Sequence, residues 1–190
     1  RAGGSAINTF NENISAWDVS SVTDMSYMFI YATSFNQPLN WNTSSVITMR
    51  SMFYQATSFN QSLNWDVSSV TNMRGMFSEA TSLNGTLTFS DTSSVTTMQN
   101  MFSRSTSFNQ PLNFDTSSVL TMDSMFLLAT SFNQSLNWDT SSVTNMFQMF
   151  YGATSFNSTL NFSDTSNVTS MQQMFSNATS FDQPLNWDVS

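Results

Sequence analysis

Methionine pairs are the most regular candidates for chemistry in this chain of 190 residues. All fourteen methionines stand in Met-x-x-Met pairs, from Met25 and Met28 to Met171 and Met174. Thioether sulfurs suit Cu(I), so the row of pairs is a candidate soft-metal site. Each second methionine is followed by Phe, however, and the pairs share the spacing of the other apolar residues. We therefore interpret them as core packing, for which the flexible thioether is well suited, and predict neither a metal nor a cofactor.

An acidic residue recurs at a second position of the pattern. It is Asp18, Asp66, Asp91, Asp115, Asp139, Asp164 and Asp188, with Asn42 in its place once. A Ca²⁺ ion takes about six to eight oxygen ligands, and one acid per repeat without a glycine-rich loop is sparse. Catalysis by paired carboxylates needs two different environments, which identical repeats do not provide. An acid before Ser-Ser instead predicts a turn that its side chain caps.

A row of asparagines follows the leucine of the Leu-Asn-Trp stretches. Its members are Asn40, Asn64, Asn113, Asn137, Asn161 and Asn186, with Thr88 once. Stacked amides can hydrogen-bond along a ladder, which would make the row structural. The same row is a possible binding face for a glycan or peptide, because repeat proteins bind on such extended surfaces. Both interpretations stay open.

Four N-glycosylation sequons occupy one position of the pattern. They are Asn60, Asn84, Asn133 and Asn157, each in the Phe-Asn-Gln stretch or its variant. At the same position, the units that carry Pro38, Pro111 or Pro184 have no sequon. We expect glycans at these four asparagines if the protein passes through a eukaryotic secretory pathway.

The Met-Phe dipeptide measures the repeat to which all these residues belong. Between Met28-Phe29 and Met174-Phe175 it recurs in steps of 24, 24, 25, 24, 24 and 25 residues. A fixed period of about 20 to 50 residues is typical of solenoids and propellers. The residue before Leu-Asn also cycles through Pro, Ser and Thr, and Ser90 and Ser163 lengthen the Thr unit by one residue. The result is a 73-residue block of three units.

Apolar spacing assigns elements within one unit. Met25, Met28, Phe29 and Ala32 have the i, i+3, i+4, i+7 spacing of a helical stripe, which predicts a short α or 3₁₀ segment. Leu-Asn-Trp at 39–41 alternates as a short strand does, with asparagine outward. A single unit cannot bury its own apolar set, so the units must stack. The predicted fold is a repeat solenoid of stacked coils, each with one short strand and one short helical or 3₁₀ segment.

Composition excludes several classes of function. Four basic residues against twelve acidic ones give a net charge of −8, which cannot neutralise a run of phosphates. We therefore expect no nucleic-acid partner. The sequence contains no apolar run of the roughly 20 residues that a membrane helix needs. It has neither Cys nor His, so a disulfide framework is excluded and no familiar catalytic constellation is present.

The unit resembles the repeat of the BspA-like leucine-rich-repeat surface proteins. The resemblance rests on Met-Phe, Ala-Thr-Ser-Phe-Asn-Gln and Trp-Asp-x-Ser-x-Val-Thr-x-Met at these spacings, from about Phe10 to Ser190. The departures are Leu83 for Phe, Gly85 and Ser158 for Gln, and Ser105 for Ala. The resemblance implies a right-handed leucine-rich-repeat coil stack in a secreted or cell-surface microbial protein that acts in adhesion. It brings no catalytic residues.

These observations together predict the organisation and role of the chain. We expect residues 1–19 to be a degenerate first repeat or junction and residues 20–190 to be a seven-repeat solenoid, part of a longer array. The expected function is that of a non-enzymatic extracellular structural or adhesive protein, with head-to-tail stacking into a filament as one form. A solenoid that binds a glycan or peptide on its asparagine-lined strand face is the alternative. Expected partners are further copies of the chain, or other surface proteins and glycans.

Overall fold

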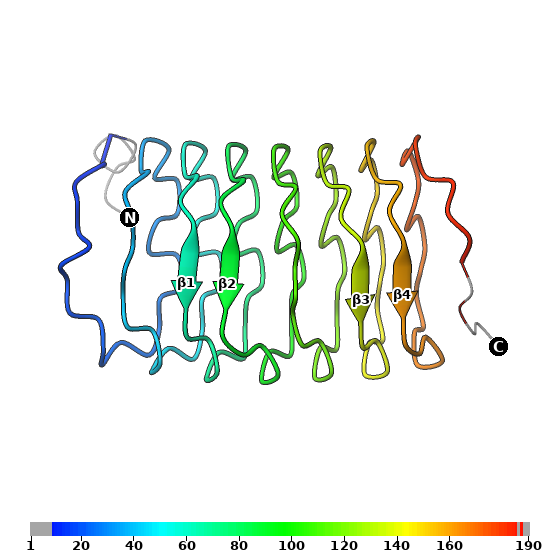
Figure 1. Cartoon of the computed structure of the whole chain (residues 1–190), viewed down its shortest axis with the longest axis horizontal. Helices are drawn as coiled ribbons and strands as arrows, with labels where there is room; N and C mark the ends of the chain where they lie inside the picture. The colour runs from blue at the N-terminus through cyan, green and yellow to red at the C-terminus, as the bar shows by residue number, and fades with distance from the viewer. Residues whose placement is uncertain (1–8, 186, 188–190) are drawn as a thin grey trace.

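The computed structural model of the chain describes residues 9–185 and 187. Coils of similar outline stand side by side from one end of the chain to the other (Figure 1). The named strands are β1 (Leu63–Trp65), β2 (Leu87–Phe89), β3 (Leu136–Trp138) and β4 (Leu160–Phe162). β1 pairs in parallel with β2, and β3 in parallel with β4. The predicted repeat fold with stacked parallel strands is confirmed at this level.

Among the described residues strands form in four coils only, so the prediction of one strand per coil is wrong. Both pairs join a coil with Ser before the leucine to a coil with Thr there, as β1 and β2 do. The Leu63 amide donates to the Thr86 carbonyl at 2.9 Å, and the Thr86 amide donates to Ser62 Oγ at 3.1 Å. Two coils whose Leu-Asn stretch is fully described without a strand have Pro38 or Pro111 at this position. Proline has no N–H to donate, and it is rarely found inside a paired strand.

The Met-Phe segment is a run of turns, and the helical prediction for it is wrong. In the first coil the Ala32 amide donates to the Phe29 carbonyl at 3.0 Å, which closes a four-residue β-turn instead of an α-helical turn. The Phe29 amide instead donates to the Met52 carbonyl of the next coil, at 2.8 Å. Because alternate amides bond between coils, the i to i+4 bonds of an α-helix do not form. The described residues hold no apolar helix that could cross a membrane.

Left-handed backbone conformations occur twice in each of these segments. In the first coil they are Tyr27 (φ 63°) and Tyr31 (φ 61°), each at the third position of a turn. The other coils repeat them at Ser51, Gln55, Gly75, Glu79, Asn100, Arg104, Ser124, Leu128, Gln148, Gly152, Gln173 and Asn177. None of these residues is β-branched, which agrees with the steric cost of such a side chain at positive φ. A left-handed residue at every fourth position also prevents a continuous helix.

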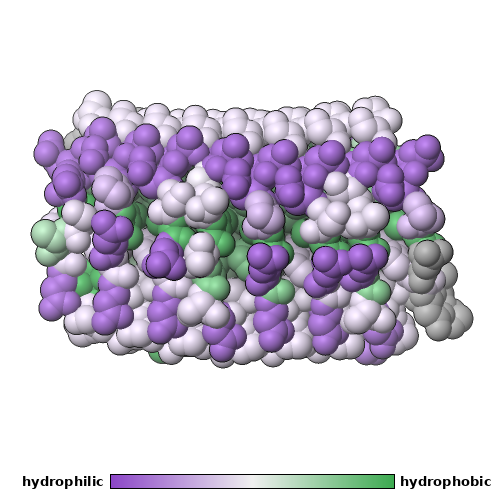
Figure 2. Space-filling view, viewed as in Figure 1, coloured by the Kyte–Doolittle hydropathy of each residue, from purple (hydrophilic) through white to green (hydrophobic). Residues whose placement is uncertain are grey.

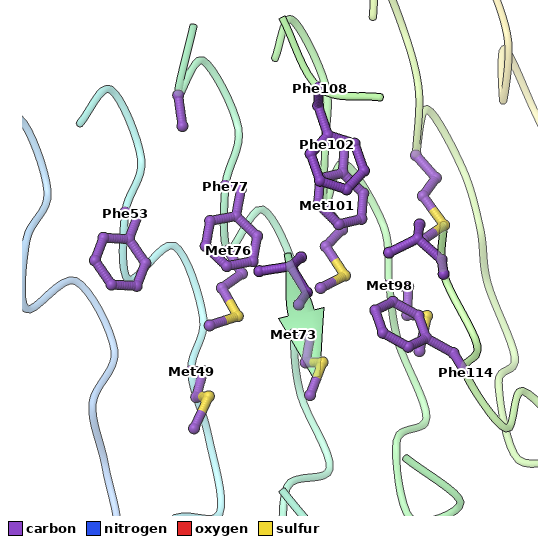
Figure 3. Close-up of a cluster of buried hydrophobic side chains, with 14 of the residues drawn as sticks. Met49, Phe53, Met73, Met76, Phe77, Met98, Met101, Phe102, Phe108 and Phe114 are labelled. Carbon is purple, nitrogen blue, oxygen red and sulfur yellow. The ribbon is translucent and has the colours of Figure 1, made fainter. Parts of the chain in front are cut away.

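Aromatic rings fill the interior of the stack. Phe53, Phe77 and Phe102 follow one another with nearly parallel rings, 5.4 Å and 5.6 Å apart between centroids (Figure 3). Within a coil, the Met-Phe ring also stacks on the ring of the Phe-Asn-Gln stretch, as Phe102 does on Phe108 at 4.3 Å. The methionines of the inner coils, such as Met76, are fully buried beside these rings. The prediction of Met and Phe as the core is confirmed there, whereas Met28 in the first coil is 38% exposed.

The extra residue of the long units is held by its own side chain. Ser90 Oγ donates to Asp66 Oδ1 of the preceding coil at 3.0 Å and accepts from the Val67 amide at 3.4 Å. Ser163 makes the equivalent bonds to Asp139 (2.9 Å) and to the Thr140 amide (3.2 Å). A serine in this place therefore lets a 25-residue unit stack on a 24-residue one without leaving the extra residue unbonded.

The described part of the degenerate first repeat packs as a coil of the stack. Phe10 stacks on Phe35 at 5.7 Å, and the indole N–H of Trp41 donates to the Ile14 carbonyl at 3.1 Å. Residues 1–8 of this predicted segment lie outside the described residues. From residue 9 onward this segment therefore packs against the coil that follows it.

Replacing Phe102 by alanine tests the ring stack. Phe102 is fully buried between Phe77 and Phe126, so its removal should leave a cavity. We expect the free energy of unfolding, measured with urea, to fall by about 3–5 kcal/mol. Leu120→Ala is the control, because Leu120 is 51% exposed, and it should change stability by less than about 0.5 kcal/mol. Equal losses for the two variants would contradict the stacked core.

Candidate functional site

The recurring acids cap the corner turns, as the sequence predicts. Asp66 Oδ1 accepts from the Ser68 amide at 3.0 Å and from the Ser68 hydroxyl at 2.7 Å. The bond from the backbone amide recurs at Asp18, Asp91, Asp115, Asp139 and Asp164, and at Asn42. The bonds from Ser68 hold the pKa of Asp66 below its ordinary value, because they stabilise the charged form. Asp188 lies outside the described residues.

Metal ligands do not converge anywhere in the described part of the chain. No group of three or more carboxylates is arranged there to hold an ion. The corner acids stand one to a coil and are already occupied by serine donors. The methionine pairs of the inner coils lie within the buried apolar core.

The asparagines of the Leu-Asn-Trp stretches face solvent. Asn40, Asn64, Asn113, Asn137 and Asn161 are all exposed, and Asn186 lies outside the described residues. Hydrophilic rows run along the stack on the face that carries the strands (Figure 2). Within this set the described side-chain ladder is a single link, from Asn161 Nδ2 to Asn137 Oδ1 at 2.5 Å. The amides of this row are therefore largely free to bind something else.

The continuous asparagine ladder lies instead in the Phe-Asn-Gln stretches. Asn109 Oδ1 accepts from the Asn133 amide of the next coil at 2.9 Å and from Gln134 Nε2 at 3.0 Å. The backbone link repeats through Asn11, Asn36, Asn60, Asn84, Asn109, Asn133 and Asn157 to the Asp182 amide. Sequence reasoning missed this ladder. The available signal was that Asn84 is retained although Phe and Gln on either side of it become Leu83 and Gly85.

The four predicted sequon asparagines belong to this ladder. Asn60, Asn84, Asn133 and Asn157 are exposed and lie along one edge of the stack. Each uses its Oδ1 as an acceptor for the next coil, while its Nδ2 donates in none of the described hydrogen bonds. The atom that a glycan would modify is therefore the one that the ladder leaves unused.

A variable turn face covers the outside of the Met-Phe segments. We define it by the two residues between the methionines and the two between Met-Phe and the following Ala (Ser105 in the fourth coil), in each of the seven coils. Its first four coils carry Ser26, Tyr27, Ile30, Tyr31, Arg50, Ser51, Tyr54, Gln55, Arg74, Gly75, Ser78, Glu79, Gln99, Asn100, Ser103 and Arg104. All four tyrosines and three of the four arginines of the chain lie on this face. Elsewhere the units are nearly identical.

Polar and aromatic contacts order the side chains of the variable turn face. The Arg50 guanidinium lies over the Tyr27 ring, 5.5 Å from its centroid. The Tyr54 hydroxyl donates to Glu79 Oε1 at 3.3 Å, and Gln55 Nε2 donates to Glu79 Oε2 at 2.7 Å. Burial, followed by the Glu79 charge, raises the pKa of the Tyr54 phenol. Sequence reasoning did not single out this face, although the differences between otherwise identical units point to it.

Alanine substitution separates the two asparagine rows. Asn109→Ala removes the acceptor of the Asn133 amide and of Gln134, and should lower the free energy of unfolding by about 1 kcal/mol. Asn113→Ala is the matched control four residues further on, where the side chain is exposed. It should be within about 0.5 kcal/mol of the parent. Urea unfolding curves of both variants measure these changes. A larger fall in the free energy of unfolding for Asn113→Ala than for Asn109→Ala would contradict the assignment of the ladder to the Phe-Asn-Gln stretches.

Comparison with known proteins places the chain in one family. No curated protein and no solved structure matches it. The family described as "Mycoplasma protein of unknown function, DUF285" matches three times, over residues 5–64, 62–137 and 112–190. The overlapping matches together span nearly the whole chain, as expected for a repeat that one family unit covers only in part. The chain therefore belongs to the DUF285 family.

Proposed function

We propose that the chain is a non-enzymatic structural and adhesive repeat protein of the cell exterior. The observation that carries the proposal is the continuous stack of Met-Phe rings from Phe29 to Phe175, with neighbouring rings 5.2–5.7 Å apart. A core of this kind extends along one axis and supports an elongated surface, as repeat proteins do. The resemblance of the unit to BspA-like surface repeats supports the same role and favours a right-handed leucine-rich-repeat solenoid.

Head-to-tail stacking into a filament is a form of this proposal that the backbone bonds favour. Four alternate amides of each inner coil, as at Met49, Ser51, Phe53 and Gln55, all donate toward the following coil. Such a ladder can be extended by any coil of the same sequence, whether it comes from the same chain or from a second copy. A head-to-tail contact of this kind does not close and propagates as a fibre.

Microscopy tests location and assembly together. We expect antibodies against residues 9–185 to label the outside of intact native cells. We also expect the purified chain to form thin filaments in negative-stain micrographs. Its apparent molecular mass, measured by light scattering, should rise with protein concentration. Label confined to the cell interior would contradict the surface role. A compact monomer at every concentration would contradict self-assembly and leave the surface role to be judged by the labelling alone.

A ligand-binding solenoid is the second candidate function. It is favoured by the exposure of Asn40, Asn64, Asn113, Asn137 and Asn161 along one face with few bonds among them. Amides in this arrangement offer both donors and acceptors to a sugar or a peptide backbone. Binding that is lost when Asn113 and Asn137 are changed together to alanine would favour this function over a purely structural one.

Glycosylation at the Phe-Asn-Gln position is a separate proposal. When the chain is secreted from a eukaryotic host, we expect glycans on Asn60, Asn84, Asn133 and Asn157. They should be absent at Asn36 and Asn109, where Pro38 and Pro111 replace the hydroxyl residue of the sequon. Peptide mass spectrometry before and after removal of N-glycans measures the occupancy. Four unmodified asparagines in secreted material would contradict the proposal.

A further inference from the structure

A hollow of about 280 Å³ opens in the variable turn face over the first four coils. Three of its lining residues, Ser51, Gly75 and Ser78, are small and form the floor of the hollow. Gly75 has φ 61°, and a Cβ there would stand 3.2 Å from Ser51 Oγ, so a larger residue would have to displace the Ser51 side chain. The same turn position in the coils on either side carries Tyr27, Ser51 and Asn100. The glycine therefore distinguishes the third coil from its neighbours.

Two arginines line this hollow without a carboxylate partner. Arg50 and Arg74 are both exposed, and within the described residues neither guanidinium forms an ion pair. The lining residues include no Asp and no Glu. The nearby carboxylate of Glu79 is bonded to Tyr54 and Gln55 and lines a different hollow. In a chain of net charge −8, a pair of unneutralised guanidiniums is a local attraction for an anion, since distant acids are screened beyond about 8 Å.

The other lining residues indicate which chemical groups the ligand should have besides its negative charge. Ile30 and Tyr54 offer apolar surfaces, and Tyr54 combines a flat face with a polar edge, while one face of the Tyr27 ring is already covered by the Arg50 guanidinium. Ser51, Ser78 and Asn100 add hydroxyl and amide groups that donate and accept hydrogen bonds. The volume is below the roughly 300–1,000 Å³ of drug-sized sites, which suits one six-membered ring. An extended acidic peptide would need a groove and would leave the hydroxyl-lined floor unfilled.

We propose that this hollow binds a carboxylate-bearing sugar residue of the sialic-acid or uronic-acid type. The carboxylate would lie against Arg50 and Arg74, because the planar guanidinium matches a carboxylate in two parallel hydrogen bonds. The sugar ring would lie against the aromatic walls, with its hydroxyls toward Ser51, Ser78 and Asn100. The assignment deepens the proposed adhesive role by naming what is held, and it places the site on a face other than the asparagine-lined strands.

Titration of the whole chain with single sugars tests the assignment. N-acetylneuraminic acid and glucuronic acid should bind with a dissociation constant of about 1–10 mM at low salt, the range of a single weak contact set. Neutral N-acetylglucosamine should bind at least tenfold more weakly. Arg50→Gln and Arg74→Gln should each weaken acidic-sugar binding about tenfold. Arg104→Gln is the matched control, since Arg104 lies in the neighbouring hollow that contains Glu79, and it should bind as the parent does.

Each other outcome overturns the proposal. Equal binding of neutral and acidic sugars would remove the role of the arginines. A hexaglutamate peptide that binds more tightly than either acidic sugar would assign the hollow to acidic protein segments, and tighter binding of inorganic phosphate would assign it to phosphate groups. Unchanged circular dichroism of the exposed arginine variants ensures that lost binding is not lost folding. Failure here leaves filament formation and surface labelling untouched, so the two proposals fail separately.

Discussion

In each Met-Phe segment, every second backbone amide donates its hydrogen bond to a carbonyl of the next coil. The architecture follows from these bonds between coils. Every described inner coil donates in this way, as Phe53 does to Met76 at 2.8 Å. The offset between coils is fixed by these bonds, so equal positions fall above one another and identical side chains meet. Phe stacks on Phe, and Asn on Asn, because the backbone has already set the register. A buried amide left without its partner would cost about twice what one such bond contributes.

The sequence predicted the repeat and its core because burial is encoded directly in the period. Met76, Phe77 and Ala80 recur at fixed distances, and all three are fully buried. The conformation of the same segment was not predictable from that spacing. An i, i+3, i+4, i+7 pattern places side chains on one side of a helix, but consecutive turns with left-handed residues do so as well. The distinguishing signal was weak: none of the left-handed positions holds Val, Ile or Thr.

Among the candidate sites, too, the sequence pattern predicts some features and not others. The corner acids were assigned correctly, because an acid before Ser-Ser has one strong local partner. The ladder through Asn109 was missed because its partner is 24 residues away, on the next coil. The hollow beside Arg50 and Arg74 was missed for a further reason. It depends on small residues from neighbouring coils, Ser51, Gly75 and Ser78, lying together, which no single residue of the sequence indicates.

The nearest-neighbour character of the stack has a mechanical consequence. The parallel bridges link Asp24 to Thr48, Thr48 to Asn72, and so on to Ser170, each joining one coil to the next. Tension applied along the axis would therefore be met by one boundary at a time, and coils would peel away in succession instead of failing together. A coil adds only about 4.8 Å to the length of the stack, whereas its chain of some 24 residues pulled straight spans about 80 Å. A stack unfolded in this way would lengthen many times over before its covalent backbone carried the load.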